Sequence, residues 1–246
     1  MTRFRASFIH LMISAFVVAT ILSVVFLFWY PGSTFEIKGA MNPVFVLVGV
    51  DLVLGPLLTL IIYKHGKPGL LFDLWFIALV QLTALGYGSY TLNSERPYYL
   101  VFSVDRITLI TNQGIDSSSI RFEEIAKKPL RDVVRVFARA PSDPLEMERL
   151  MESVIFEGQP DLERRPEYWE PWQSGSETIR AAIIPLEDFE PASELERQRI
   201  AEAIERFSAD HPNLGMLPIG GIEDDIGMLM DMDSLTELGV IRINPW

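Results

Sequence analysis

Few residues of this 246-residue chain have the types and spacing that catalysis requires. The histidines, His10, His65 and His211, fall in segments that we expect to lie far apart, so they cannot form one site. There is no cysteine, which excludes disulfides, iron–sulfur ligation and thiol catalysis. Fingerprints of phosphate-binding loops, dinucleotide-binding folds, serine hydrolases and zinc proteases are also absent from the sequence. We therefore expect no enzymatic activity and no cofactor.

An acidic cluster near the C-terminus offers the oxygen ligands that a calcium ion prefers. Its members are Glu223, Asp224, Asp225, Asp231 and Asp233. The spacing does not match the EF-hand loop, which needs a central glycine and a glutamate at its last position. A solvated acidic face is the favoured interpretation, and we expect no metal site.

Asp51 is the carboxylate whose position most strongly suggests a function. It lies about eight residues into a long apolar segment, near the middle of a bilayer, where a carboxylate is costly and marks a candidate functional site. Three roles stay open: packing within the helix bundle, recognition of a group on another protein, and proton or ion transport. Packing is favoured. Matched depth predicts its partners among Gln81, Thr83, Thr20 and Ser23.

Small residues near Asp51 favour close approach between helices. Gly55 and Pro56 lie one turn beyond it, and the proline should kink the helix because it lacks an N–H donor. Ala84 and Gly88 form a small-xxx-small pair in the third apolar segment. Together with Asp51 and Gln81, these residues form a candidate surface for recognition or packing inside the membrane.

Three apolar runs predict three transmembrane helices, over about residues 7–30, 43–63 and 70–92. Each is long enough to cross a hydrocarbon core of about 30 Å. A cleaved signal peptide is the alternative for the first run. However, the run is longer than the ~7–15 residues of the apolar core of a signal peptide and ends in bulky aromatic residues instead of a cleavage site.

A short polar turn separates the second and third runs. It contains Lys64, His65, Gly66, Lys67, Pro68 and Gly69. Glycine and proline favour a tight turn, so these two helices should form an antiparallel hairpin. Asp73 follows closely and should lie at the membrane surface, where Lys67 can neutralise it.

Basic residues predict the orientation. With three spans, Arg3, Arg5, Lys64 and Lys67 fall on one side, and Lys38 and Arg96 fall on the other. The positive-inside rule places the first group in the cytoplasm. Residues 95–246 then lie across the membrane, which in a Gram-negative cell is the periplasm.

We expect residues 1–94 to form a membrane domain. The remainder of the chain, residues 95–246, is expected to fold as one α+β domain. Strands are expected over 98–111 with a turn at 103–106, over 133–138, and in a hairpin of 226–232 and 238–243. Capping patterns at Asp143 and Ser193 begin two helices. Residues 159–172 are expected to be a loop with exposed aromatic residues.

Charge divides the chain in the same way. Residues 1–94 carry five basic and three acidic side chains, a net charge of +2, so the total of −12 leaves −14 for the remainder. A domain this acidic repels phosphate backbones, which argues against nucleic acid as a partner.

Several segments resemble the type IV pilin accessory proteins of the TfpX/TfpZ family. The resemblance covers essentially the whole chain, and its most specific parts are residues 47–60 (LVGVDLVLGPLLTL), 64–73 (KHGKPGLLFD) and 96–106 (RPYYLVFSVDR). The ending at residues 244–246 (NPW) and the segment 165–168 (RPEY) are also similar.

The resemblance implies an inner-membrane, chaperone-like protein that helps one specific major pilin to enter a type IV pilus. Its implied partners are that pilin, other pilus assembly components and membrane lipid. A pilin helix carries a free, usually methylated, amino terminus and a buried glutamate near it, both of which are polar targets. A membrane-anchored periplasmic sensor and a small transporter that uses Asp51 are the alternatives.

Overall fold

A computed structural model describes residues 2–127, 129–220 and 226–246. The chain divides into two compact units. The first consists of Met1–Pro31 and Gly39–Arg96, and the second of Gly32–Lys38 and Pro97–Trp246. By length and composition, three helices of the first unit can each cross a membrane, and the second unit is a mixed α+β domain. The predicted fold class is confirmed.

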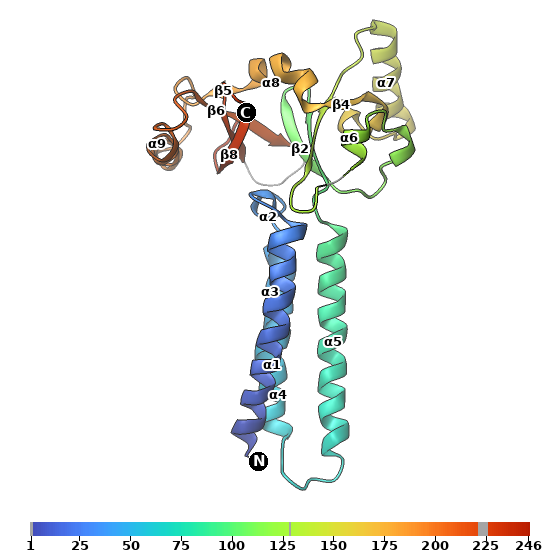
Figure 1. Cartoon of the computed structure of the whole chain (residues 1–246), viewed down its shortest axis with the longest axis vertical. Coiled ribbons are helices and arrows are strands. Elements are labelled where there is room, and N and C mark those ends of the chain that lie inside the picture. Colours follow the sequence, from blue (N-terminus) through green and yellow to red (C-terminus); the bar gives the residue numbers. More distant parts are fainter. Residues whose placement is uncertain (1, 128, 221–225) are drawn as a thin grey trace. The chain divides into compact units, whose positions relative to one another are not determined.

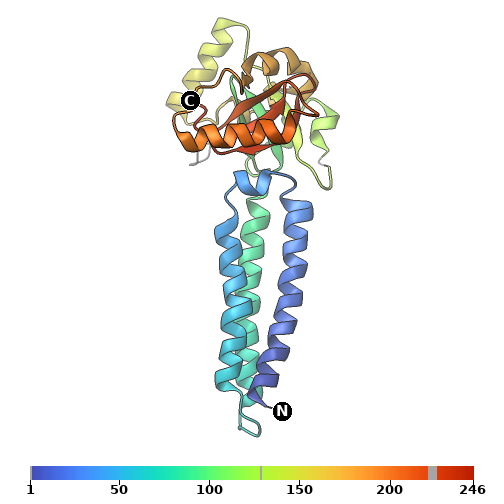
Figure 2. The ribbon, with the colours of Figure 1, turned by 90° about the vertical axis from the view of Figure 1, so that its left-hand side faces the viewer.

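The first unit is a bundle of three long helical segments (Figures 1 and 2). The first joins α1 (Arg3–Val24) to a π-helical segment, η1 (Val25–Trp29). The second consists of α3 (Met41–Val48), a π-helical segment η2 (Gly49–Leu54) and α4 (Gly55–Ile62), and the third is α5 (Leu70–Ser94). α1 packs along α4, and both α3 and α4 pack along α5.

The second helical segment changes its hydrogen-bond pattern where the sequence predicts a kink. Pro56 lacks the N–H that would bond four residues back. In the turn before it, the Gly55 N–H bonds to the Val50 carbonyl five residues back, which is the π-helical pattern. Asp51 lies inside this widened turn, and its side chain is buried. The irregular backbone therefore surrounds the carboxylate singled out from the sequence.

Eight strands of the second unit form one mixed sheet. Its order is β4-β3-β1-β2-β6-β7-β8, and β5 pairs with β6 outside this path. β1 pairs in parallel with β3, β2 pairs in parallel with β6, and the other neighbours are antiparallel. The strands are β1 (Tyr99–Ser103), β2 (Arg106–Ile110), β3 (Val134–Ala138), β4 (Trp169–Pro171), β5 (Ile184–Pro185), β6 (Leu214–Gly220), β7 (Gly227–Asp231) and β8 (Thr236–Ile241).

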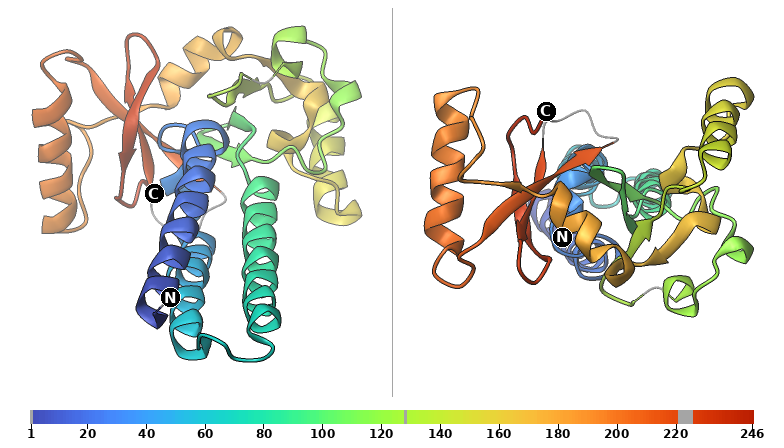
Figure 3. Two further views of the ribbon diagram at one scale, coloured as in Figure 1. Left: turned by 60° about the horizontal axis from the view of Figure 1, so that its bottom comes forward. Right: turned by 90° about the horizontal axis from the view of Figure 1, so that it is seen from above.

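Helices cover both faces of this sheet (Figure 3). The core on one face includes Phe102, Leu217 and Ile179 of α8 (Ser176–Ala182). On the other face, α6 (Glu123–Ala126) and α7 (Pro144–Glu157) pack near β1 and β3, and α9 (Glu194–Phe207) packs on β6, β7 and β8. Short 3₁₀ turns complete the unit: η3 (Ser117–Ser119), η4 (Leu162–Arg164), η5 (Pro166–Tyr168) and η6 (Trp172–Gly175).

One short segment joins the second unit from a distant part of the sequence. Gly32–Lys38, which contains α2 (Thr34–Ile37), belongs to that unit although it lies between the first two long helices in sequence. Ile37 is 3% exposed and belongs to the same apolar core as Phe102 and Met230. Glu36 Oε1 accepts a hydrogen bond from Arg242 Nε at 3.1 Å. The soluble fold is therefore completed by a residue that precedes it by about sixty positions.

The caps and hairpins predicted from the sequence are confirmed. Asp143 caps α7 and Ser193 caps α9, each through its side-chain oxygen. β1 with β2 and β7 with β8 are antiparallel hairpins.

The expected exposed loop over residues 159–172 is wrong. That segment forms η4, η5 and β4. Trp169 is fully buried and its ring lies 4.6 Å from that of Tyr99, and Trp172 is buried in the core on the other face. The prediction rested on the prolines and charged residues of the segment. It failed because burial of Trp169 and Trp172 packs the segment against the sheet.

Candidate functional site

Four polar side chains form a continuous hydrogen-bonded chain inside the membrane-spanning unit. Thr59 Oγ1 lies 2.6 Å from His10 Nδ1, and His10 Nε2 lies 2.8 Å from Gln81 Oε1. Gln81 Nε2 donates to Asp51 Oδ1 at 3.2 Å and to the Asp51 backbone carbonyl at 3.3 Å. The chain links all three long helical segments, because His10 belongs to α1, Gln81 to α5, and Thr59 and Asp51 to the segment between them.

The donors and acceptors along this chain are mutually consistent. Gln81 donates to Asp51 through its amide nitrogen, so its amide oxygen is the acceptor that faces His10. The hydrogen of the His10–Gln81 bond must then come from His10 Nε2. In a neutral ring Nδ1 is left to accept from the Thr59 hydroxyl, so every bond has one donor and one acceptor.

Gly55 makes room for the Gln81 side chain. A Cβ added at Gly55 would lie 2.1 Å from Gln81 Nε2 and 2.5 Å from Gln81 Cδ, which is impossible without a rearrangement. Next to it, the Pro56 carbonyl accepts a hydrogen bond from Ser7 Oγ at 2.8 Å. The Gly55-Pro56 pair thus permits two polar contacts between helices, one through a missing side chain and one through a backbone oxygen.

One oxygen of the Asp51 carboxylate takes no part in this series of hydrogen bonds. The Asp51 side chain is 5% exposed, and Oδ2 has no hydrogen-bond partner among the residues that the structure describes. Buried carboxylate oxygens are normally paired, because an unpaired one loses its hydration without compensation. A hydrogen-bond donor from another molecule would therefore stabilise this site most by bonding to Asp51 Oδ2.

Sequence reasoning identified part of this constellation. Gln81 contacts Asp51, but Thr20, Ser23 and Thr83 do not, because each hydroxyl donates to a carbonyl four residues earlier in its own helix. His10 and Thr59 were not expected as members. Depth matching missed them because Thr59 lies eight positions after Asp51, roughly 12 Å along the helix, and long side chains span that distance.

Ala84 and Gly88 lie further along α5. A Cβ at Gly88 would lie 3.5 Å from Leu47 Cδ1 of α3, so this side of α5 packs against a helix of the same unit. A groove of about 440 Å³ lies between α4 and α5 and is lined mainly by apolar side chains, with Gly55 and Gln81 in its wall and Asp73 among its lining residues. The groove thus places Gln81, a middle member of the hydrogen-bonded series, next to a surface that another apolar segment can contact.

The turn between α4 and α5 has the conformation that its composition predicts. Gly66 and Gly69 have φ angles of +77° and +80°, which favour glycine. The Lys67 N–H bonds to the Lys64 carbonyl at 3.0 Å, and Pro68 follows. Lys67 Nζ lies 2.6 Å from Asp73 Oδ2, so the two charges neutralise each other at this end of the bundle.

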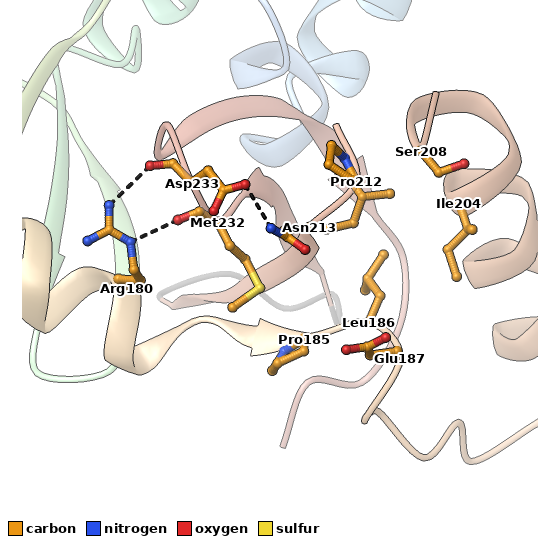
Figure 4. A pocket seen from close by; sticks show the side chains of 11 residues that line it. Arg180, Pro185, Leu186, Glu187, Ile204, Ser208, Pro212, Asn213, Met232 and Asp233 are labelled. Carbon is orange, nitrogen blue, oxygen red and sulfur yellow. Dashed lines mark hydrogen bonds between the residues drawn. The ribbon is translucent and has the colours of Figure 1, made fainter. Parts of the chain in front are cut away.

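In the second unit, a hollow of about 290 Å³ lies beside the β7–β8 turn (Figure 4). Arg180 donates to the carbonyls of Met232 and Asp233 at 3.0 and 3.1 Å, and Asn213 Nδ2 donates to Asp233 Oδ2 at 2.8 Å. These contacts hold the turn against α8. Arg180 and Asn213 in Figure 4 thus both bond to the turn, as expected of a structural support.

Two members of the predicted acidic cluster take part in local hydrogen bonds. Asp231 Oδ2 lies 2.9 Å from His211 Nδ1, and Asp233 bonds to Asn213. Glu223, Asp224 and Asp225 lie outside the described residues. Within residues 2–127, 129–220 and 226–246, there is no group of three or more His, Asp or Glu side chains that could hold a metal ion.

The fold and this site define a class: a small membrane-anchored protein whose spans carry a buried polar chain and whose separate α+β domain is built on a mixed sheet. Residues 1–32 match the family model described as fimbrial assembly protein FimB.

Curated relatives extend the match along the chain. A fimbrial assembly protein of serogroup I from Dichelobacter nodosus is 28% identical over 220 residues, which cover 87% of this chain and 85% of the relative. The fimbrial assembly protein of serogroup E1 from the same organism is 27% identical over 220 residues, which again cover 87% of this chain and 85% of the relative. The protein of serogroups C1 and C2 is 33% identical over 113 residues, 45% of this chain and 86% of the relative. No solved structure matches.

The chain belongs to the fimbrial assembly protein family. The family resemblance read from the sequence is thereby confirmed.

Proposed function

We propose that this protein is a membrane-embedded, chaperone-like helper that promotes the assembly of one specific type IV major pilin into pili. Its relatives are named for fimbrial assembly, and they match it along most of both chains. The observation that carries the proposal is the buried Asp51 carboxylate, whose Oδ2 lacks a partner among the described residues. A donor brought by another transmembrane helix would complete its hydrogen bonding.

The pilin helix has suitable chemistry for this contact. The family resemblance implies a free amino terminus on the pilin helix, near Asp73 in depth in the resting pilin. As the pilin helix moves outward during extraction, this amine comes to the depth of Asp51 and can donate to its carboxylate inside the membrane. The groove between α4 and α5 supports the same idea, because its apolar wall suits an apolar helix and Gln81 leads from it to Asp51. Binding energy would come mainly from packing, and the polar contact would supply selectivity.

The same proposal assigns an orientation. The N-terminus and the Lys64–Lys67 turn lie in the cytoplasm, and the second unit lies in the periplasm of a Gram-negative cell. The support is the distribution of Arg3, Arg5, Lys64 and Lys67 against Lys38 and Arg96. In this orientation the α+β domain is on the side where pilin heads reside.

Two substitutions at Asp51 separate recognition from packing. Asp51→Asn keeps size and hydrogen bonding to Gln81 but removes the charge, and Asp51→Leu removes both. We expect Asp51→Asn to keep a normal protein level while surface piliation and photocrosslinking to the pilin fall severalfold. The control is Thr83→Val, because the Thr83 hydroxyl bonds within its own helix.

The opposite pattern would assign Asp51 to packing. If Asp51→Asn changes neither piliation nor pilin crosslinking while Asp51→Leu lowers the protein level, charge recognition is wrong. If deletion of the whole chain leaves piliation intact, the assembly function itself is wrong. The sensor and transporter alternatives would then be tested through signalling output and solute uptake in the deletion strain.

A further inference from the structure

The outward face of α7 exposes large apolar side chains. Met151 is 53% exposed, Ile155 is 65% exposed and Phe156 is 81% exposed. Leu145 at the start of the helix is 62% exposed. Soluble domains usually bury such residues or scatter them singly, and a cluster of them on one element marks an interaction site.

These residues are not needed for the fold of the second unit. α7 packs on the sheet through Leu150, supported by Met147 and Val154. At 100° of rotation per residue, Met151 and Ile155 lie next to one another, and Leu145 and Phe156 lie further around the helix, away from Leu150. α7 therefore has two apolar faces, of which the sheet uses one. The sequence pattern could not separate them, because Met151 and Ile155 also fit the spacing of the buried face.

Two carboxylates lie within the exposed face. Glu148 and Glu152 are one helical turn apart and occupy the angular interval between Met151–Ile155 and Leu145–Phe156. Both are exposed, and neither forms a salt bridge or hydrogen bond to another residue that the structure describes. The face thus combines apolar contact area with two negative charges that are available to a partner, and exposed Arg149 lies at its edge beside Phe156.

This combination restricts the kind of partner. An anionic lipid surface or a nucleic acid would be repelled by Glu148 and Glu152. A second copy of the same face would bring these carboxylates towards one another, which is also unfavourable. The partner that fits is a protein surface with apolar side chains and lysine or arginine residues placed to meet the two carboxylates.

We propose that the α7 face, defined as Leu145, Glu148, Met151, Glu152, Ile155 and Phe156, docks a basic and apolar patch on the soluble head of the pilin. This inference rests on the proposed function and deepens it. The membrane spans would contact the pilin helix, and α7 would contact the pilin head. Two contacts on one partner strengthen each other because the second occurs within an already formed complex.

Photocrosslinking in intact cells tests the contact directly. A photoreactive amino acid is placed at Ile155 of the full-length membrane protein, and at Glu205 on α9, which is also exposed, as a control. Antibodies to the pilin and mass spectrometry then identify the product. We expect a crosslink from Ile155 to a Lys- or Arg-containing apolar patch of the pilin head, and none from Glu205. A crosslink from Ile155 to a second copy of this chain, or to lipid alone, overturns the proposal.

Charge reversal tests the electrostatic part. Glu148→Lys with Glu152→Lys should lower the crosslink yield about tenfold, as expected when two attractive charges become repulsive. Reversing the two contacting basic residues of the pilin should restore it. The matched control, Glu202→Lys with Glu205→Lys on α9, should have no effect. A retained crosslink after reversal on α7 overturns the electrostatic assignment.

Failure of the α7 proposal and failure of the proposed function give different results. If the deletion strain lacks pili but Ile155 gives no pilin crosslink, the α7 proposal is wrong and the proposed function stands. If the deletion strain makes normal pili, the proposed function is wrong. Heat unfolding of each purified variant checks that the substitutions, all on exposed side chains, leave the fold intact.

Discussion

Gly55 occupies a position where a single methyl group decides the packing of three helices. The Gln81 amide lies where a Cβ of residue 55 would be, and the same amide joins His10 to Asp51. Any larger residue must displace Gln81, and the three hydrogen bonds of its amide would be lost together. The absence of a side chain is thus the property that this position requires.

Gly55→Ala should lower the thermal stability of the detergent-solubilised protein and its level in the membrane. Gln81 must leave its position, so Asp51 and His10 lose a partner at a cost of about 1–2 kcal/mol for each bond inside a membrane. Gly49→Ala is the control, since nothing lies within 4 Å of a Cβ there. Equal effects of the two substitutions would contradict this account.

His10 should be coupled energetically to Gln81. His10→Leu removes the acceptor for Thr59 and the donor for Gln81, and Gln81→Leu removes the other half of the second bond. Because both single changes break the same interaction, the double variant should be less destabilised than their sum by about 0.6–1.7 kcal/mol. Thermal unfolding of the four proteins measures this difference. Strict additivity would mean that the bond contributes nothing.

Sequence alone located the centre of the site but not its extent. A carboxylate in an apolar helix is costly, so its presence alone marks Asp51 as a candidate site residue. Gln81 lies at a similar depth on a neighbouring helix. His10 and Thr59 were missed because which faces of the helices meet depends on helix rotation and tilt. Those quantities are set by packing, which one sequence does not reveal.

At the level of elements, α2 supplies an apolar anchor to the soluble core. Ile37→Ala should lower the free energy of unfolding of the second unit by about 2–5 kcal/mol, because a buried isoleucine is replaced with a cavity. Urea unfolding of the full-length protein, followed by tryptophan fluorescence, measures this. The control is Ile155→Ala, whose side chain is 65% exposed. An unchanged midpoint for Ile37→Ala would show that the sheet core does not depend on α2.

The β7–β8 turn should give the second unit an acid-sensitive contribution to stability. Burial alone would raise the pKa of the Asp231 carboxyl, but hydrogen bonds from His211, Ser234 and the Asp233 amide outweigh it and hold this pKa below its usual value. A lowered pKa stabilises the fold at pH values above the unfolded pKa of about 3.9, and this contribution is lost as the pH falls through the folded value.

Asp231→Asn should therefore be less stable than the parent at pH 7, and the gap should narrow below about pH 4. Urea midpoints between pH 7 and pH 3 measure it. Asp105→Asn, a change on an exposed carboxylate, is the control. A gap that stays constant across this range would mean that the ionised carboxylate has no special role in the turn.

Elements with local signals were predictable, and those with non-local signals were not. Asp143 and Ser193 begin their helices through side-chain caps that the sequence displays directly. β6 was missed, although it is buried along nearly its whole length at the centre of the sheet, because Gly215, Pro218 and Gly220 interrupt its pattern. Pairing with β7 and with β2, which lies about a hundred residues earlier in the sequence, makes this segment a strand, and the second of these partners gives no local signal.

On the scale of the whole molecule, the distribution of basic residues predicts how the chain crosses the membrane. A reporter that is active only in the periplasm should be active when fused after Trp246 and silent when fused at Lys67. Expression levels of the two fusions, compared by immunoblot, serve as the control. The reverse pattern of activity would invert the proposed orientation.

The division into an apolar part and an acidic part was visible in the composition, and the three spans followed from it. The assignment of Gly32–Lys38 to the second unit was not visible. A short segment between two apolar runs has the composition of an ordinary connection, and nothing in its residues shows that Ile37 is buried. That fact depends on a core whose other members lie beyond residue 99.

The inclusion of α2 in the soluble core also imposes an order of events during synthesis. Ile37 leaves the ribosome early, whereas its core neighbours Met228 and Met230 come almost two hundred residues later, and the Glu36–Arg242 contact spans 206 positions. At about 5–20 residues per second, the early segment waits on the order of ten seconds or more for its partners. During this interval Ile37 is an unburied apolar residue next to the membrane. A chain that stops before the last strands lacks Met228 and Met230, so we expect Ile37 to stay incompletely buried in such products.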